Sequence, residues 1–259
     1  MEIIIIGLVA FFAAILTFFS GFGLGTILTP VMMVFFPVDI AVAFTGIVHF
    51  SNNIFKLFIV GNKADKKVWL YFGIPAIIAA FVGSYFLVIM DTDYIMYSFS
   101  FFGNVNSVSY VKFLISLLLI VFAFMDLIPF FKKLEFGEKS LPIGGVLSGF
   151  FGGLSGNQGA LRSSFLIKLN LKKEVFIATT VIISFFVDLT RLGVYFSDLS
   201  NINLEDYYIL GLVSISSAIL GAFIGNKLLK KVTLNYIRIL VALLILILAF
   251  GLLLGLIWF

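Results

Sequence analysis

Long apolar segments of this chain are interrupted twice by glycine, at Gly21-Phe22-Gly23-Leu24-Gly25-Thr26 and at Gly152-Gly153-Leu154-Ser155-Gly156-Asn157-Gln158-Gly159. Thr29-Pro30 follows the first break, and Arg162-Ser163-Ser164 follows the second. When apolar segments interrupted by glycine or proline occupy corresponding positions in two halves of a membrane protein, they point to the substrate site of a transporter. The paired breaks therefore predict a transporter whose site lies between two related halves.

The composition is that of a membrane protein. Hydrophobic residues make up 62% of the 259 residues and charged residues only 12%, which is far from the composition of soluble domains. The net charge is +4, but the 17 basic residues fall mostly in short loops, where they orient spans and do not form a nucleic-acid surface. The absence of cysteine excludes disulfides and thiol chemistry. Because no basic region accompanies Glu2 at the N-terminus, a cleaved signal peptide is not expected.

Eight apolar segments are predicted to lie in the membrane as helices. Six of them are predicted to span it, and two are broken by the glycine stretches. The predicted spans are residues 40–60, 68–90, 109–131, 175–197, 207–226 and 234–258, and the broken segments are residues 3–36 and 141–167. An all-α, polytopic membrane protein is therefore expected.

The charges of the loops orient these segments. Four loops are basic, whereas two are acidic and contain no basic residue. The basic loops are residues 61–67, 132–139, 168–173 and 227–231, and the acidic loops are residues 91–109 and 198–206. Because basic loops stay in the cytoplasm, the basic loops are predicted inside and the acidic loops outside. Both ends of segment 141–167 are then inside, so this segment is predicted to be a re-entrant hairpin whose break lies within the membrane.

Segment 3–36 is predicted to be a second hairpin, which enters from outside. Its 34 residues are too many for one span and too few for two. Each half of the chain, residues 1–135 and residues 136–259, then contains one hairpin and three spans. Because three crossings are an odd number, the second half is predicted to be inverted relative to the first, which is a common plan of secondary transporters.

Weak similarity between the halves supports this repeat. Aligning Gly25 with Gly159 and allowing one residue of slip places Lys56 opposite Arg191. Two patches of small residues also correspond, Ala79-Ala80-Phe81-Val82-Gly83 and Gly221-Ala222-Phe223-Ile224-Gly225. Small residues at four-residue spacing let helices approach closely in a membrane, and we interpret both patches as packing surfaces.

The candidate substrate site consists of the two half-helices that follow the breaks, roughly residues 26–36 and 159–168. The N-terminus of each half-helix is predicted to point towards the middle of the membrane, where free N–H groups and the helix dipole attract anions. Arg162 adds a positive charge at a depth where cations normally face a cavity, a partner or a substrate. We predict that Arg162 contacts the substrate; the alternative is a structural ion pair with Asp188 or Asp126. The other site residues predicted around the breaks are Gly25, Thr26, Thr29, Asn157, Gln158, Gly159, Ser163 and Ser164.

The span 40–60 presents a polar face. His49, Asn52, Asn53 and Lys56 are three or four residues apart and share one side of a helix, so His49, Asn52 and Asn53 are added to the predicted site. The single histidine is a candidate proton carrier and equally a candidate neutral hydrogen-bonding group. For Lys56, near the cytoplasmic end of the span, we expect the amine to reach the membrane surface.

The span 175–197 carries Asp188 and Arg191, which are expected to pair with each other near its outer end. Asp126 is interpreted as a helix-interface residue, with proton transfer as the alternative. The sequence contains no nucleophile with an adjacent base, no metal-spaced cluster and no G-x-x-x-x-G-K phosphate loop. The chain is therefore predicted to be neither an enzyme nor an ATP-driven pump, and to need no cofactor.

These motifs resemble a known family. The stretch from Gly149 to Gly156, its counterpart from Gly21 to Pro30, and Pro75-Ala76 with Gly83 are similar to the TauE/SafE sulfite exporter family over about residues 5–253. The resemblance implies a multi-pass protein of the prokaryotic inner membrane that moves sulfite, sulfoacetate or other organosulfonates. The chain departs from the family pattern at Asn157-Gln158, Arg162 and Ser164, which changes the wall of the implied site.

The predicted function is that of a secondary transporter that moves small sulfur-containing anions by alternating access. The half-helix N-termini and Arg162 are predicted to hold the anion. An anion channel and a transporter of another small carboxylate or oxyanion are the alternatives. The predicted partners are the anion and the lipid bilayer, without nucleic acid. A coupled proton or sodium ion, a homodimer and the direction of transport are left open.

Overall fold

The computed structural model describes residues 2–20, 23–90, 94–101, 104–128, 137–199, 207–228 and 234–255 of the 259-residue chain. Gly21 and Phe22 of the first break, parts of four predicted loops and the side chain of Asp126 lie outside this description. The role of Asp126 therefore stays a prediction.

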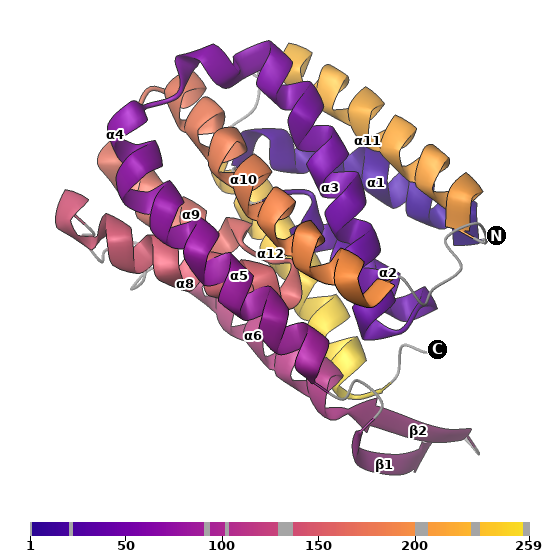
Figure 1. Cartoon of the computed structure of the whole chain (residues 1–259). Helices are drawn as coiled ribbons and strands as arrows, with labels where there is room; N and C mark the ends of the chain where they lie inside the picture. The colour runs from indigo at the N-terminus through magenta and orange to yellow at the C-terminus, as the bar shows by residue number, and fades with distance from the viewer. Residues whose placement is uncertain are drawn as a thin grey trace.

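The helices follow the predicted segments closely (Figure 1). The first broken segment forms α1 (Glu2–Ser20) and α2 (Gly25–Phe35), and the second forms α8 (Leu141–Ser155) and α9 (Gly159–Leu166). The predicted spans correspond to α3 (Val38–Val60), α5 (Ile74–Ile89), α6 (Tyr110–Leu127), α10 (Lys173–Leu199), α11 (Tyr208–Leu228) and α12 (Leu234–Leu253). Within the described ranges, four helical stretches are long and apolar enough to cross a membrane: Val38–Lys63, Lys66–Ile89, Lys173–Phe196 and Tyr208–Leu228. The all-α polytopic membrane fold is confirmed.

Short helical elements flank α5, α8 and α9. They are η1 (Gly61–Lys63), α4 (Lys66–Val68) and the π-helical turn η2 (Trp69–Gly73) before α5, η3 (Glu138–Ser140) before α8, and η4 (Ile167–Leu169) after α9. The π-helical turn lies directly before Pro75, whose ring nitrogen cannot donate the hydrogen bond that would continue a regular α-helical ladder.

A small antiparallel sheet occupies the acidic loop 91–109, where no strand was predicted. It consists of β1 (Ile95–Phe101) and β2 (Asn104–Ser109), with Tyr97 opposite Val108. Aromatic and serine residues alternate along β1, which is the period of two that indicates a strand. The loop was interpreted from its charge alone, and charge gives no information about strand periodicity.

The second broken segment folds back on itself. Gly156 ends α8 with φ of +76°, a left-handed conformation that favours glycine. The Ser148 hydroxyl donates to the Gln158 carbonyl at 2.9 Å, and a Cβ added to Gly144 would lie 2.6 Å from the ring of Phe165. The end of α9 therefore lies beside the start of α8, as expected for a re-entrant hairpin.

Each hairpin packs against the opposite half of the chain. The helix α8 lies along α5, and α1 lies along α11 (Figure 1). A Cβ on Gly83 would overlap the carbonyl of Phe150, and one on Gly221 would overlap the carbonyl of Phe11. The missing side chains thus bring the helix backbones into contact. The packing interpretation of the two small-residue patches is confirmed.

The two hairpins enter from opposite ends of the bundle. Contacts in order along the chain show that α5 and α8 are parallel, that α1 and α11 are parallel, and that α3 and α10 are antiparallel. The contacts are Gly145–Phe72, Gly149–Ala76 and Gly153–Ala80; Gly7–Val213 and Gly225–Phe18; and Gly46–Arg191 and Phe50–Phe185. Because α5 runs opposite to α3 and α11 opposite to α10 (Figure 1), α1 and α8 start at opposite ends. This arrangement agrees with the inverted repeat, which stays a prediction together with its boundary at residues 135 and 136.

Candidate functional site

Charged side chains gather in the interior of the bundle. In the described part of the chain, four lysine, arginine or acidic side chains are buried: Lys56, Arg162, Asp188 and Arg191, each at most 3% exposed. They come from α3, α9 and α10. Three are basic and one is acidic, so the buried set has an excess of basic groups.

The carboxylate of Asp188 is the centre of this cluster. Its Oδ2 accepts a hydrogen bond from Asn53 Nδ2 at 2.9 Å and lies 2.6 Å from Nδ1 of His49. Its Oδ1 accepts hydrogen bonds from Gln158 Nε2 at 3.2 Å and from Arg191 Nε at 3.0 Å. The expected pair of Asp188 and Arg191 is confirmed. The carboxylate also contacts α3 and the second glycine break, and the predicted depth of the pair near the outer end of the span stays a prediction.

Gln158 connects this carboxylate to Arg162. The Gln158 Oε1 accepts a hydrogen bond from Arg162 Nη1 at 3.0 Å, and the same nitrogen donates to the Ser184 hydroxyl at 2.5 Å. Because Gln158 immediately precedes α9, the non-helical residues of the second break stand between the arginine and the carboxylate. Gln158 therefore couples the two charges through its amide.

A small cavity lies beside Arg162. None of the described residues that line it is acidic. They are Thr17, Phe18, Gly23, Asn53, Lys56, Arg162, Thr180, Val181 and Ser184. Two basic groups, three hydroxyls and one amide thus face the same space. The cavity has a volume of about 10 Å³, which is room for about one water molecule. A small ligand with negative charge and oxygen atoms, which this lining suits, therefore requires the cavity to widen.

Lys56 does not extend to the membrane surface, so that expectation is wrong. Its side chain is buried, and its ammonium lies 5.3 Å from the centre of the Phe18 ring. With the Asn52 amide oriented to satisfy both of its groups, the amide oxygen lies 3.1 Å from the Lys56 ammonium and its nitrogen donates to the Ala218 carbonyl at 3.2 Å. Asn52 therefore positions Lys56 from the side of α11.

The two glycine breaks meet beside the network. A Cβ on Gly25 would lie 2.9 Å from the carbonyl oxygen of Gly156. A Cβ on Gly23, whose φ is +85°, would lie 2.8 Å from Nε2 of His49. The first break thus contacts both the second break and the polar face of α3, and a side chain at either glycine would separate them.

The other predicted site residues have different surroundings. Thr26, Thr29, Gly159 and Ser163 are buried at the starts of α2 and α9. Asn157 is buried in the break and donates from Nδ2 to the Ser155 carbonyl at 3.0 Å. The hydroxyl of Ser164 bonds to the Ala160 carbonyl of its own helix at 2.9 Å, away from the described residues that line the cavity.

Comparison with protein families identifies the chain. A family model described as Sulfite exporter TauE/SafE matches residues 6–252. The chain belongs to the TauE/SafE sulfite exporter family. Comparisons with curated proteins and with solved structures gave no match. The resemblance noted in the sequence is confirmed, and membership makes this chain a multi-pass membrane transporter of sulfite or related sulfur-containing anions, working in a lipid bilayer.

Several residues of this TauE/SafE chain that face the cluster were not in the predicted site. They are Thr17, Lys56, Thr180, Ser184, Asp188 and Arg191. A periodic signal exists for those on α10, because the last four lie three or four residues apart and share one helical face. Lys56 belonged to the equivalent face of α3. For Thr17, whose hydroxyl donates to the Ala13 carbonyl at 2.6 Å, the sequence offers no signal.

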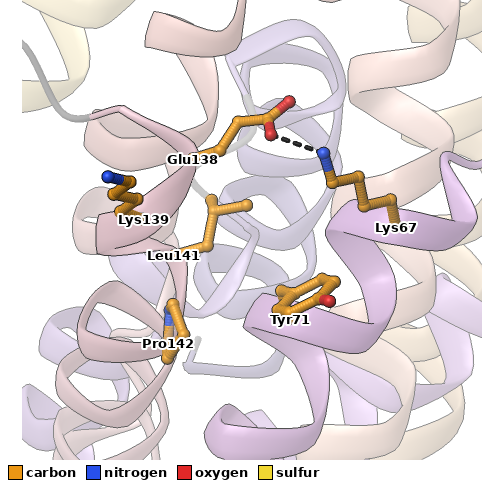
Figure 2. A pocket seen from close by; sticks show the side chains of 6 residues that line it. All are labelled: Lys67, Tyr71, Glu138, Lys139, Leu141 and Pro142. Atoms are coloured by element: carbon orange, nitrogen blue, oxygen red, sulfur yellow. Dashed lines mark hydrogen bonds and ion pairs between the residues drawn. The ribbon is translucent and has the colours of Figure 1, made fainter.

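A second pocket of this TauE/SafE chain lies between α4 and η2 on one side and η3 and the start of α8 on the other. Its volume is about 350 Å³, and it is lined by Lys67, Tyr71, Glu138, Lys139, Leu141 and Pro142. Figure 2 shows Lys67 facing Glu138 across this pocket, with the ammonium 2.5 Å from the carboxylate. Both side chains are about 60% exposed. The pocket is therefore a solvated region with paired charges and lacks the buried basic excess of the interior.

Proposed function

We propose that this chain is a secondary transporter that moves sulfite or a small organosulfonate by alternating access. The observation that carries the proposal is the lining of the interior cavity, where two buried basic side chains, Lys56 and Arg162, lie beside hydroxyl and amide groups and no described residue is acidic. Charged side chains at membrane depth normally face a cavity, a partner or a substrate. An anion in this cavity would lie between Lys56 and Arg162, and the family match supports a sulfur-containing one.

The side chains of the cavity have distinct roles in this proposal. Arg162 presents a planar fork of donors that fits two oxygens of an oxyanion, and Lys56 adds a second positive group from α3. Ser184 on α10 adds a hydroxyl donor, whereas the hydroxyl of Thr180, one turn earlier, donates to the Ile177 carbonyl at 2.8 Å. The N-terminus of α9 contributes a further partial positive charge, since Arg162 lies in its first turn. An entering anion would take over the donors that Arg162 now directs at Gln158 and Ser184.

The packing of the hairpins supports alternating access as the mode of transport. Each hairpin lies against a span of the other half, and the two breaks meet at the cluster. Movement of one half against the other would then open the cluster alternately to the two sides. The family resemblance further suggests the inner membrane of a prokaryote as the location.

The proposal is tested by counterflow in liposomes that contain the purified protein. We expect saturable uptake of radiolabelled sulfite that rises when unlabelled sulfite is present inside, because a carrier that returns loaded with unlabelled sulfite exchanges it for the labelled anion. Uptake without saturation or stimulation would indicate an anion channel. Sulfoacetate, taurine, sulfate and acetate serve as competitors. Equal competition by acetate would assign the site to small carboxylates and overturn the sulfur specificity.

A further inference from the structure

The cluster has basic groups on both sides of Asp188. Because α3 and α10 are antiparallel, Gly46 lies level with Arg191, and a Cβ on Gly46 would be 3.5 Å from the Cζ of Arg191. Lys56 is ten residues further along α3, and Ser184 is seven residues before Arg191 on α10. With a rise of about 1.5 Å per residue, Arg191 lies about 10 Å from Ser184 and about 15 Å from Lys56 along the bundle. His49 and Asp188 lie between them.

Polar atoms around Arg191 lack partners within the described part of the chain. Arg191 Nη1, Thr29 Oγ1 and Thr45 Oγ1 are buried and make no hydrogen bond there. Two of these atoms converge on one point, since a Cβ on Gly156 would lie 3.0 Å from Thr29 Oγ1 and 3.1 Å from Arg191 Nη1. Buried polar groups are nearly always hydrogen-bonded. An arginine nitrogen and a hydroxyl that converge without partners therefore point to a ligand that is bound in another state of the protein.

The sequence alignment of the halves relates this place to the cavity. The register that places Lys56 opposite Arg191 also places Asn53 opposite Asp188. Asn53 and Asp188 contact each other at 2.9 Å, as residues on the axis of a two-fold relation would. Lys56 and Arg191 then lie on opposite sides of that axis. Two inverted halves would thus supply one basic group to each side of the central carboxylate.

We propose that Arg191 and Thr29, whose polar atoms converge beside Gly156, form a second subsite for the transported oxyanion, on the side of Asp188 away from Lys56 and Arg162. The inference rests on the proposed function and adds a second stopping place for the same substrate. In the state described here, the carboxylate of Asp188 occupies Arg191 through Nε and Nη2, at 3.0 and 2.9 Å. The anion would bind Arg191 when the network of His49, Asn53 and Gln158 releases that side. The Asp188 carboxylate thus serves as an internal counter-ion. It neutralises Arg191 while this subsite is empty and moves away when the anion binds there.

The experiment measures the half-saturating sulfite concentration separately on the two faces of the membrane. The chain contains no cysteine, so an Asn62→Cys substitution in the exposed loop after α3 reports the orientation of each molecule through an impermeant thiol reagent. Arg191→Gln is expected to raise the half-saturating concentration about tenfold on the face of the acidic loops and less than about twofold on the other. Lys56→Gln is expected to raise it about tenfold on the face of the basic loops and less than about twofold on the face of the acidic loops.

Two further variants keep the test decisive. Thr29→Val removes one hydroxyl without touching Asp188. We expect it to raise the half-saturating sulfite concentration about threefold on the face of the acidic loops only. This variant keeps the test informative if Arg191→Gln does not fold. The matched control is Thr190→Val on α10, beside Arg191. Among the described contacts, the Thr190 hydroxyl donates only to the Phe186 carbonyl of its own helix, so the half-saturating sulfite concentration should stay unchanged on both faces. Equal effects of Arg191→Gln and Thr29→Val on both faces, or no effect on either, would overturn the second subsite. Failure of the unaltered protein to transport sulfite would instead overturn the proposed function.

Discussion

The interior cluster and the ends of the helices use charge in opposite ways. At the ends, Lys63 pairs with Glu174 and Lys67 with Glu138, and all four side chains are about half exposed or more. In the interior, the described part of the chain buries three basic side chains, Lys56, Arg162 and Arg191, and one carboxylate, that of Asp188. Water solvates the exposed pairs, so they need no further partner. The buried excess has no such solvent, and this difference is why we assign the anion to the interior.

The comparison is tested most strongly at Asp188. Replacing it with alanine should destabilise the protein by about 3–5 kcal/mol, because buried Arg191 would lose its counter-charge and three other groups, His49, Asn53 and Gln158, their acceptor. The measurement is the free energy of unfolding in detergent, by denaturant titration. Asp188→Asn keeps the shape of the side chain and part of its hydrogen bonding, so its free energy of unfolding should fall by less than that of Asp188→Ala. A loss below about 1 kcal/mol for Asp188→Ala would mean that the interior tolerates unpaired charge as the surface does.

An intermediate effect is expected where the hairpin α8 touches α5. A Cβ at Gly149 would overlap the backbone carbonyl of Ala76, so Gly149→Ala should cost about 1–3 kcal/mol by overpacking. The matched control is Gly193→Ala on α10, where no atom lies within 4 Å of the added Cβ. That control should be neutral or stabilising because alanine favours helix. Equal melting temperatures for the two variants would contradict the close packing that holds the breaks in place.

The smallest effect is expected at the exposed pocket of Figure 2. Lys67→Gln should change the free energy of unfolding by less than about 1 kcal/mol, because exposed ion pairs contribute little. Sulfite affinity, measured by calorimetry, should stay within about twofold. A tenfold loss of affinity would move the anion site from the interior to this pocket and reverse the comparison.

The sequence predicts the helices and the breaks because both are local signals. Apolar length sets the spans, and Gly23 and Gly156 mark the two breaks through conformations that other residues rarely adopt. The polar face of α3 was also visible, since His49, Asn53 and Lys56 recur at helical spacing. The direction in which Lys56 points was not predictable, because it depends on Asn52 and Phe18 from the packed bundle.

The centre of the site depends on contacts between distant parts of the chain. Asp188 meets His49 across 139 positions of sequence and Gln158 across 30. No local period links these residues, so the sequence could place Asp188 beside Arg191 but could not show that it joins both halves. The β1–β2 hairpin was missed for a different reason. Its alternating pattern was present, but the loop was interpreted from its charge alone.

The most direct test of the account is the titration of sulfite into the purified protein and into Arg162→Ala by isothermal calorimetry. We predict that the unaltered protein binds sulfite and that Arg162→Ala binds it at least about 100-fold more weakly, because the cavity loses its fork of donors and one of its two positive groups. Arg162→Lys should fall between them, and matching melting curves would show that the variants are folded. Unchanged affinity in a folded Arg162→Ala protein would contradict the assignment of the anion to this interior cluster.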